Sequence, residues 1–161
     1  MPVPANARLP RQTGRDKRFV ILASEFHAAI TRALLQGAID TLRKHGAAPA
    51  RIRVLWVPGA FELPVVAARI AQGRPRPHAI IALGVLIRGE TPQYEVLAHA
   101  VAQGLTQVSV ERAIPVTFGV VVAETLAQAK ARAGLVGNRG VEAALAALGV
   151  LNVFEKLTPQ K

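Results

Sequence analysis

The stretch "HAIIALGVLI", residues 78–87, is a nearly unbroken apolar run. A run without polar alternation is typical of a strand in a parallel sheet whose two faces are both covered. The next residues, "RGETPQ" (88–93), hold Thr91 as a candidate N-cap and Pro92 as a suitable first helical residue. We therefore predict a buried strand at 78–87 and a helix that starts at Pro92 and ends near Arg112.

The same alternation of apolar strand and amphipathic helix continues on both sides of this stretch. Further strands are expected at 18–23, 52–57 and 115–122. Further helices are expected at 28–46, at 63–73, at about 125–133 and at about 140–153, with Asn138 as a cap candidate before the last. Strands that alternate with helices indicate a parallel sheet with helices on both faces. We predict a three-layer α/β/α sandwich with a four-stranded parallel sheet, of the flavodoxin-like type.

The length of the chain, 161 residues, favours a single domain. Residues 1–18 hold five basic residues and one acidic residue, a net charge of +4, together with three prolines and no apolar periodicity. This composition is typical of a flexible segment. We predict a flexible basic arm at 1–17, one domain at 18–156 and a short tail at 157–161.

The composition of the chain argues against a membrane-spanning protein and against a disulfide-bonded one. Hydrophobic residues make up 51% and the mean hydropathy is +0.30, yet no apolar run approaches the roughly 18 residues that a membrane helix needs. A deep core or apolar subunit interfaces are therefore expected, and no membrane partner. The absence of cysteine excludes disulfides and thiolate metal sites. No secretory signal is visible, so a cytoplasmic protein is expected.

The net charge of +10 indicates an anionic partner. A basic arm can contact nucleic acid. Because no aromatic residues interleave with the charges of the arm, a solvated segment is favoured over a nucleic-acid site. The charge of the domain suits an anionic small substrate at least as well as a polymer.

The expected ligand site follows from the fold, because parallel α/β sheets bind ligands at the carboxyl ends of their strands. Phe26, Phe61 and Tyr94 lie in or beside the loops after the first three strands, and Phe118 lies in the fourth strand. Aromatic side chains at one edge of a sheet favour a flat ligand that can stack. Polar residues share these loops, namely Glu25, His27, Glu62, Arg88, Glu90 and Thr91.

A phosphate group also suits this edge. Free backbone N–H groups at the start of the helix that follows Thr91 can bind phosphate. The chain has neither a Walker motif nor G-x-G-x-x-G, so a nucleoside triphosphate or a dinucleotide is not indicated.

Ordered motifs over about residues 18–154 resemble those of the lumazine synthase family. They are "VPGAFELP" (57–64), "ALGVLIRGET" (82–91), "IPVTFGV" (114–120), "QAKARAG" (128–134) and "GNRGVEAALAAL" (137–148). The resemblance implies condensation of 5-amino-6-(D-ribitylamino)uracil with 3,4-dihydroxy-2-butanone 4-phosphate. The product would be 6,7-dimethyl-8-ribityllumazine, a precursor in riboflavin biosynthesis, made by a transferase that uses no metal and no organic cofactor.

The resemblance also implies how the pyrimidine substrate is held. Phe26 should stack on the pyrimidine ring. The ribityl chain and the ring should be lined by Ala60, Phe61 and Glu62. The uracil should meet backbone groups of Val85, Leu86 and Ile87.

The second substrate and the assembly are implied in the same way. Glu90 and Thr91 should hold the phosphate at the helix start, with Arg132 as its cation. Phe118 should come from a neighbouring subunit of a homopentamer. The "GNRG" break resembles family members that build icosahedral shells of sixty subunits, although this chain is one residue shorter there.

The chain departs from the family pattern at two places. Gln93 stands where the family usually has the histidine assigned to proton transfer, and Glu25, Phe26 and His27 replace Arg-Phe-Asn. Glutamine can hydrogen-bond but cannot carry a proton near neutral pH, so His27 is a possible substitute. Holding the two substrates together can supply much of the catalysis.

We therefore expect a lumazine synthase with an altered acid–base residue. Two alternatives remain open. One is a catalytically weakened paralogue that binds lumazine or flavin. The other is a shell or scaffold protein with an arm that binds polyanions.

Overall fold

The computed structural model describes residues 9–11 and 13–159. One parallel sheet runs through the molecule, with the strand order β2-β1-β3-β4. The strands are β1 (Phe19–Ser24), β2 (Ile52–Val57), β3 (Ala79–Ile87) and β4 (Val116–Ala123). This arrangement confirms the predicted four-stranded parallel sheet.

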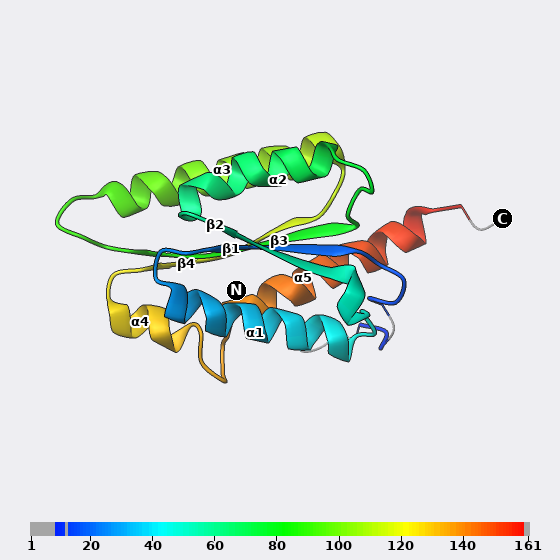
Figure 1. Cartoon of the computed structure of the whole chain (residues 1–161), viewed down its shortest axis with the longest axis horizontal. Helices are drawn as coiled ribbons and strands as arrows, with labels where there is room; N and C mark the ends of the chain where they lie inside the picture. Colours follow the sequence, from blue (N-terminus) through cyan, green and yellow to red (C-terminus); the bar gives the residue numbers. More distant parts are fainter. Residues whose placement is uncertain (1–8, 12, 160–161) are drawn as a thin grey trace.

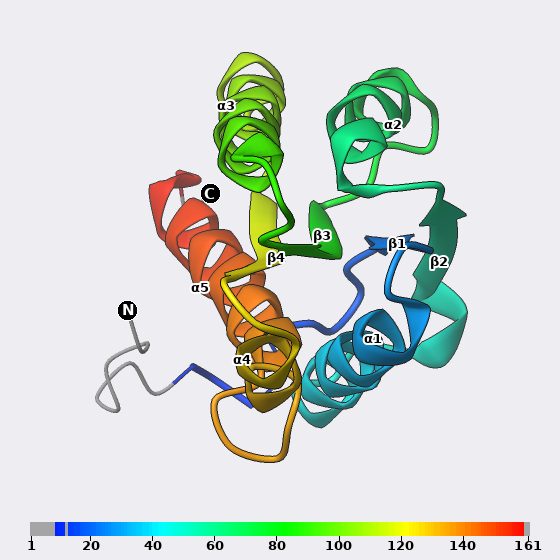
Figure 2. The same ribbon diagram turned by 90° about the vertical axis from the view of Figure 1, so that its left-hand side faces the viewer.

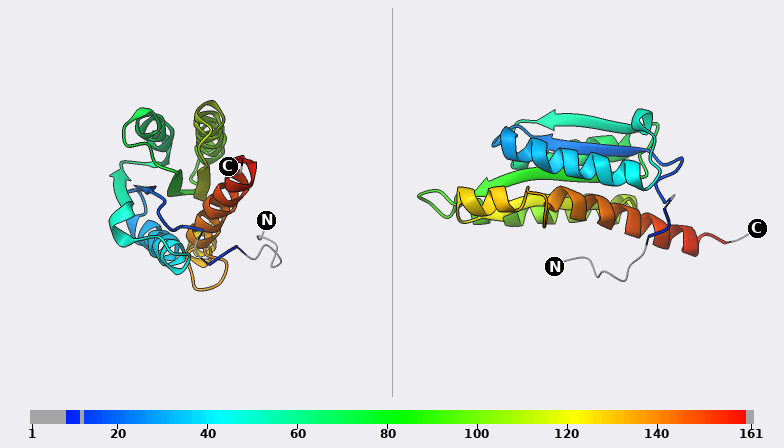
Figure 3. Two further views of the ribbon diagram at one scale, coloured as in Figure 1. Left: turned by 90° about the vertical axis from the view of Figure 1, so that its right-hand side faces the viewer. Right: turned by 90° about the horizontal axis from the view of Figure 1, so that it is seen from below.

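Helices cover both faces of the sheet (Figures 1 and 2). They are α1 (Ala28–Lys44), α2 (Leu63–Gln72), α3 (Gln93–Arg112), α4 (Leu126–Ala131) and α5 (Arg139–Leu157), with short 3₁₀ turns η1 (Pro49–Arg51) and η2 (Ala60–Glu62). Helices α2 and α3 lie on one face, and α1, α4 and α5 lie across the other (Figure 3, left). The predicted α/β/α sandwich is confirmed. Within the described residues no helix has both the length and the apolar character needed to cross a bilayer.

The central strands show why their sequences lack polar alternation. In β1, Phe19 and Ile21 face the core under α1 and α5, whereas Val20 and Leu22 face the core under α2 and α3. Side chains of a strand alternate between its two faces, so a strand covered on both faces must be apolar at every position. The sheet separates the two hydrophobic cores, and its strands contribute side chains to both.

The ends of the helices confirm one predicted cap, Asn138, and correct another, Thr91. Gly46, with φ 93°, closes α1, and the side chain of Asn138 caps α5 by accepting hydrogen bonds from the backbone N–H of Gly140 (2.8 Å) and Val141 (3.2 Å). The predicted Thr91 cap is wrong by one residue. The first carbonyl to accept helical N–H groups is that of Pro92, from Glu95 at 3.1 Å. Pro92 is therefore the N-cap, and α3 begins at Gln93.

Other boundaries also differ from the prediction. Helix α5 continues to Leu157 instead of ending near residue 153, and α4 is shorter than the expected 125–133. Residues 1–8 and 12 of the expected arm lie outside the described residues. At its described end, Thr13 and Gly14 are buried, and Lys17 pairs with Glu155 of α5 at 2.9 Å. This end of the arm is attached to the domain.

His78, at the start of β3, gives the fold a testable dependence on pH. Its Nδ1 accepts a hydrogen bond from the backbone N–H of Arg18 (2.9 Å), so the ring is held neutral. Burial, followed by the positive charges of Arg18, Lys17 and Arg51, lowers the pKa of His78 below its ordinary value of 6.5. Below that ordinary value the unfolded chain binds a proton that the folded chain resists, so stability is lost as the pH falls.

We expect the free energy of unfolding to drop as the pH falls through the ordinary histidine value of 6.5, and to drop less in His78→Asn. The asparagine oxygen can accept the same N–H without titrating. Urea unfolding followed by the fluorescence of Trp56 measures both. Equal pH dependence in the two proteins would show that His78 does not contribute.

Candidate active site

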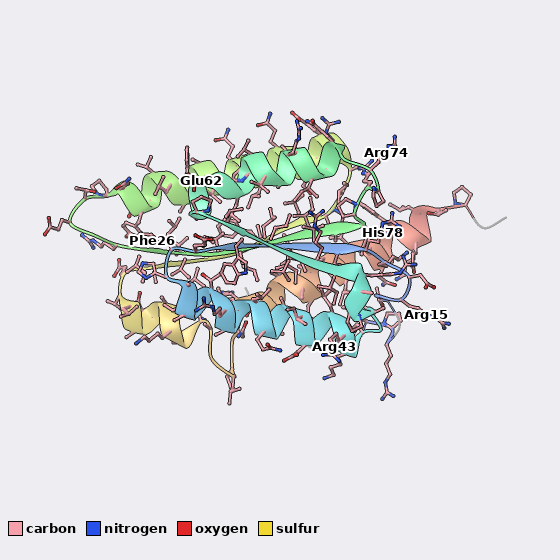
Figure 4. The ribbon with its side chains drawn as sticks, viewed as in Figure 1. Arg15, Phe26, Arg43, Glu62, Arg74 and His78 are labelled. Atoms are coloured by element: carbon pink, nitrogen blue, oxygen red, sulfur yellow. The ribbon has the colours of Figure 1, made fainter. Side chains whose placement is uncertain are left out.

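A pocket of about 350 Å³ lies at the carboxyl edge of the sheet. It is formed by the loops after β1, β2 and β3 and by the first turns of α3. Most of the predicted site residues line it, namely Phe26, His27, Ala60, Phe61, Glu62, Val85, Leu86, Ile87, Thr91 and Gln93. Their convergence follows from the parallel sheet, which brings the ends of all strands to one edge. Figure 4 shows Phe26 and Glu62 at this end of the molecule.

The loop after β1 presents an aromatic ring to the pocket. The N–H of Glu25 binds the carbonyl of Val57 (2.8 Å), and the N–H of Phe26 binds that of Pro58 (3.2 Å), which ties this loop to the end of β2. Phe26 remains 69% exposed, with one edge contact to His27 at 5.0 Å between ring centroids. An exposed ring on a fixed backbone can stack on a flat ligand.

His27 lies beside Phe26 in an unusual backbone conformation. Its φ of 59° is left-handed, which few residues other than glycine and asparagine adopt readily. The conformation turns the chain from β1 into α1, because the carbonyl of His27 accepts hydrogen bonds from Ile30 (3.0 Å) and Thr31 (3.1 Å). His27 is therefore held in the pocket by the start of a long helix.

The loop after β2 supplies a carboxylate. The turn η2 carries Glu62 into α2, and a Cβ on Gly59 would lie 3.1 Å from Glu62 Oε2. Among the described residues the Glu62 carboxylate forms neither an ion pair nor a hydrogen bond. It is therefore free to accept hydrogen bonds from a ligand.

The end of β3 offers backbone groups. Pairing of β3 with β1 stops at Ala23↔Leu83, whereas pairing with β4 continues to Ile87↔Ala123. The last residues of β3 therefore have no strand partner on their β1 side. Unpaired backbone groups that line a pocket bind complementary donors and acceptors of a ligand.

The sequence analysis missed Leu97, which also lines the pocket. Leu97 lies one turn after Gln93 on α3, a spacing that places both on one face of the helix. In β3, next to the lining residue Val85, a Cβ on Gly84 would lie 2.8 Å from the buried Ser24 Oγ, which has no hydrogen-bond partner in the described chain. A glycine inside a strand is the signal for such a close approach.

The predicted phosphate site is changed by the position of the helix start. Because Pro92 has no N–H, the free donors at the start of α3 are the N–H groups of Gln93 and Tyr94. Thr91 lines the pocket, whereas Glu90 is exposed and does not.

Arg132 and Phe118 lie elsewhere. They line a separate hollow of about 540 Å³ along β4 and α5, together with Arg139 and Glu142, which pair with each other. Strand β4 is an edge strand, and Phe118 on it is 42% exposed. The two predicted site residues therefore line the same hollow, and neither of them lines the active-site pocket.

Comparison with known proteins decides the family. A family model described as 6,7-dimethyl-8-ribityllumazine synthase matches residues 16–155. The chain belongs to the lumazine synthase family. This confirms the resemblance found in the motifs of the sequence.

Curated relatives in the family carry the same name and match nearly their whole length. The 6,7-dimethyl-8-ribityllumazine synthase of Gemmatimonas aurantiaca is 47% identical over 147 residues, which cover 91% of this chain and 89% of the relative. That of Leuconostoc mesenteroides is 41% identical, covering 94% and 96%. That of Chlorobium limicola is 43% identical, covering 89% and 93%.

Proposed function

We propose that the protein is a lumazine synthase, which condenses 5-amino-6-(D-ribitylamino)uracil with 3,4-dihydroxy-2-butanone 4-phosphate to 6,7-dimethyl-8-ribityllumazine. The observation that carries the proposal is the pocket at the carboxyl edge. It combines an exposed aromatic ring, an unpaired carboxylate and free backbone groups in one space, and these match the three parts of the ribitylaminouracil.

Each part of the pyrimidine substrate has a partner of suitable chemistry. Phe26 stacks on the ring, since aromatic–base stacking is worth about 1–3 kcal/mol. Glu62 accepts hydrogen bonds from ribityl hydroxyls, and Ala60 and Phe61 pack beside the chain. The uracil edge pairs with the backbone of residues 85–87, where β3 has no strand partner on its β1 side.

The second substrate is bound through its phosphate by the N–H groups of Gln93 and Tyr94, with Thr91 beside them. The positive end of α3 favours an anion there. In the reaction the primary amine of the pyrimidine attacks the ketone carbon and water leaves as the imine forms. Loss of inorganic phosphate and closure of the ring with loss of a second water give the product.

We propose further that the functional unit is a pentamer whose sites lie between copies. Among the described residues, no arginine lines the pocket of one copy, whereas Arg132 and Phe118 both line a hollow at the β4 edge. A neighbouring copy that docks this edge against the pocket would add the phosphate cation and a second aromatic wall. Exposed apolar side chains such as Val96 and Val110 on α3 favour such contacts. Whether pentamers assemble into an icosahedral shell is a separate question for mass photometry.

A turnover assay tests the activity. Both substrates are incubated with the protein, and lumazine absorbance is followed against the uncatalysed background. We expect a rate clearly above background. Binding of lumazine without turnover would support the weakened paralogue instead, and neither binding nor turnover would support a scaffold role.

The shared site predicts complementation between two damaged subunits. Phe26→Ala removes the stacking ring on the pocket side, and Arg132→Ala removes the cation on the other side. Co-expressed in equal amounts, the two variants should regain about a quarter of the wild-type rate, because a quarter of the interfaces then pair two undamaged faces. The comparison is made at substrate concentrations below the Michaelis constants.

The control for this experiment pairs Phe26→Ala with Arg112→Ala, an exposed arginine outside both hollows. Oligomers of that pair should regain about half of the rate, because every Arg132 is intact and half of the pockets keep Phe26. A mixture of Phe26→Ala and Arg132→Ala that only averages the two slow variants would contradict sites between copies.

A further inference from the structure

A second hollow lies at the opposite end of the sheet from the active-site pocket. Its volume is about 440 Å³, and it lies among the starts of β1 and β2, the end of α2 and the loop before β3. Of the residues that the structure describes, five arginines line it, namely Arg18, Arg51, Arg53, Arg69 and Arg74, and no acidic residue does. We call it the arginine pocket. Figure 4 shows Arg74 at this end of the molecule, far from Phe26 and Glu62.

The charges of these arginines are not compensated. None of the five forms an ion pair with a carboxylate of the residues that the structure describes. Instead, the guanidinium of Arg18 donates to the backbone carbonyl of Arg76 (2.8 and 3.2 Å), and that of Arg51 donates to the carbonyl of Asp16 (3.3 Å). Carbonyl oxygens hold these two side chains in place without neutralising them.

The same positive charges act on His78, which lies beside this end of the sheet. After burial, the charges of Arg18, Lys17 and Arg51 lower the pKa of His78. Like charges gathered around a concave surface repel one another, and a concave surface concentrates their field. A multivalent anion would relieve that repulsion.

A solvated basic face is the simplest alternative, and three features argue against it. The arginines come from separate segments, yet they converge on one hollow. Its size lies within the range of small-ligand sites. All five cations are arginines, whose planar fork binds phosphate oxygens in pairs, whereas lysine acts as a point charge.

We propose that the arginine pocket binds a small ligand with two or more phosphate groups. A single phosphate carries at most about two negative charges, too few to balance five guanidinium groups, so several phosphates are expected. This site is distinct from the place where the active-site pocket would hold the phosphate of its substrate. The proposal does not depend on the proposed activity.

Calorimetry with tripolyphosphate on the full-length assembled protein tests the proposal at about 0.15 M salt. The double variant Arg53→Gln/Arg69→Gln removes two exposed arginines whose side chains form no hydrogen bond with the described residues. It should weaken binding about tenfold or more, since hydrogen bonds to charged groups are strong. The matched control Arg43→Gln/Arg112→Gln removes the same charge from exposed positions outside the pocket.

The control should change the dissociation constant by no more than about twofold, because screened charges outside the pocket contribute little. Inorganic phosphate should bind wild type far more weakly than tripolyphosphate. If both double variants weaken tripolyphosphate binding equally, the effect comes from the net charge of the protein and not from the pocket, and the proposal is overturned.

Two further measurements identify where tripolyphosphate binds and which class of ligand the arginine pocket prefers. Arg132→Ala should leave tripolyphosphate binding unchanged, and a loss there would place the anion at the substrate site and overturn the proposal. A short single-stranded RNA is the last probe. If it binds more tightly than tripolyphosphate through the same two arginines, the pocket belongs to a nucleic-acid surface and the small-ligand proposal fails.

Discussion

Gly140→Ala is expected to lower the free energy of unfolding by about 3 kcal/mol or more, or to prevent folding. A methyl group on Gly140 would overlap the backbone carbonyl of Leu34, with the carbonyl carbon only 2.6 Å away. Backbone atoms of α1 cannot move aside as a flexible side chain can. Helices α1 and α5 would have to separate, which would expose the buried Leu34 and Leu148 between them.

The same helix provides the matched control. A methyl group on Gly149 of α5 would meet nothing within 4 Å. Gly149→Ala should therefore be neutral or stabilise the helix by up to about 1 kcal/mol, the difference in helix propensity. Urea unfolding followed by circular dichroism compares the two variants. Equal stabilities would show that α1 can shift at no cost and would contradict the close contact.

The contacts of Gly140 and Asn138 give the "GNRG" motif (137–140) a structural role. Asn138 caps α5 and also donates to the carbonyls of Ala33 (3.3 Å) and Ala133 (3.1 Å). A Cβ on Gly37 of α1 would lie 2.8 Å from Asn138 Oδ1. Two glycines and one buried asparagine thus join α1 to α5, and the motif has a structural reason besides the proposed function.

The strands and their order could be predicted because burial on both faces makes each central strand apolar throughout. The exact ends of the helices could not be predicted, because they depend on contacts between residues that are distant in the sequence. Thr91 and Pro92 both suit a helix start, and only the acceptor of the first helical N–H decides between them. Helix α5 extends to Leu157 while Lys17 binds Glu155 near its end, a pairing that no local pattern indicates.

Some residues of the candidate site could likewise be placed from the sequence, and others could not. Residues that follow a strand, such as Phe26 and Glu62, could be placed because all strands end at one edge. Arg132 could not be placed, because a linear motif does not tell which face of the fold carries it. The arginine pocket was not predicted either, since its members are spread from Arg18 to Arg74 and only tertiary structure gathers them.

Two residues of the active-site pocket, Gln93 and His27, bear on proton transfer. Gln93 is the first residue of α3 and His27 precedes the first residue of α1, and both line the pocket. Gln93→His should speed turnover and introduce a dependence on pH near the ordinary histidine pKa of about 6.5. The reason is that glutamine hydrogen-bonds without exchanging a proton, whereas imidazole can give and take one.

The native enzyme should then depend on His27. His27→Asn is the informative variant, because asparagine tolerates the left-handed backbone that alanine would strain. It should slow turnover by about 10²-fold or more, the usual contribution of a general acid–base group. In the Gln93→His background the same change should slow turnover much less, because the new histidine performs the transfer.

His99→Ala is the control, since His99 is an exposed residue of α3 that does not line the pocket, and its loss should leave the rate unchanged. The pH profiles of kcat for the native protein and the single and double variants decide the question. If Gln93→His changes neither the rate nor its profile, position 93 takes no part in proton transfer. If His27→Asn is also without effect, catalysis rests on positioning alone, which can supply roughly 7–11 kcal/mol without any proton carrier.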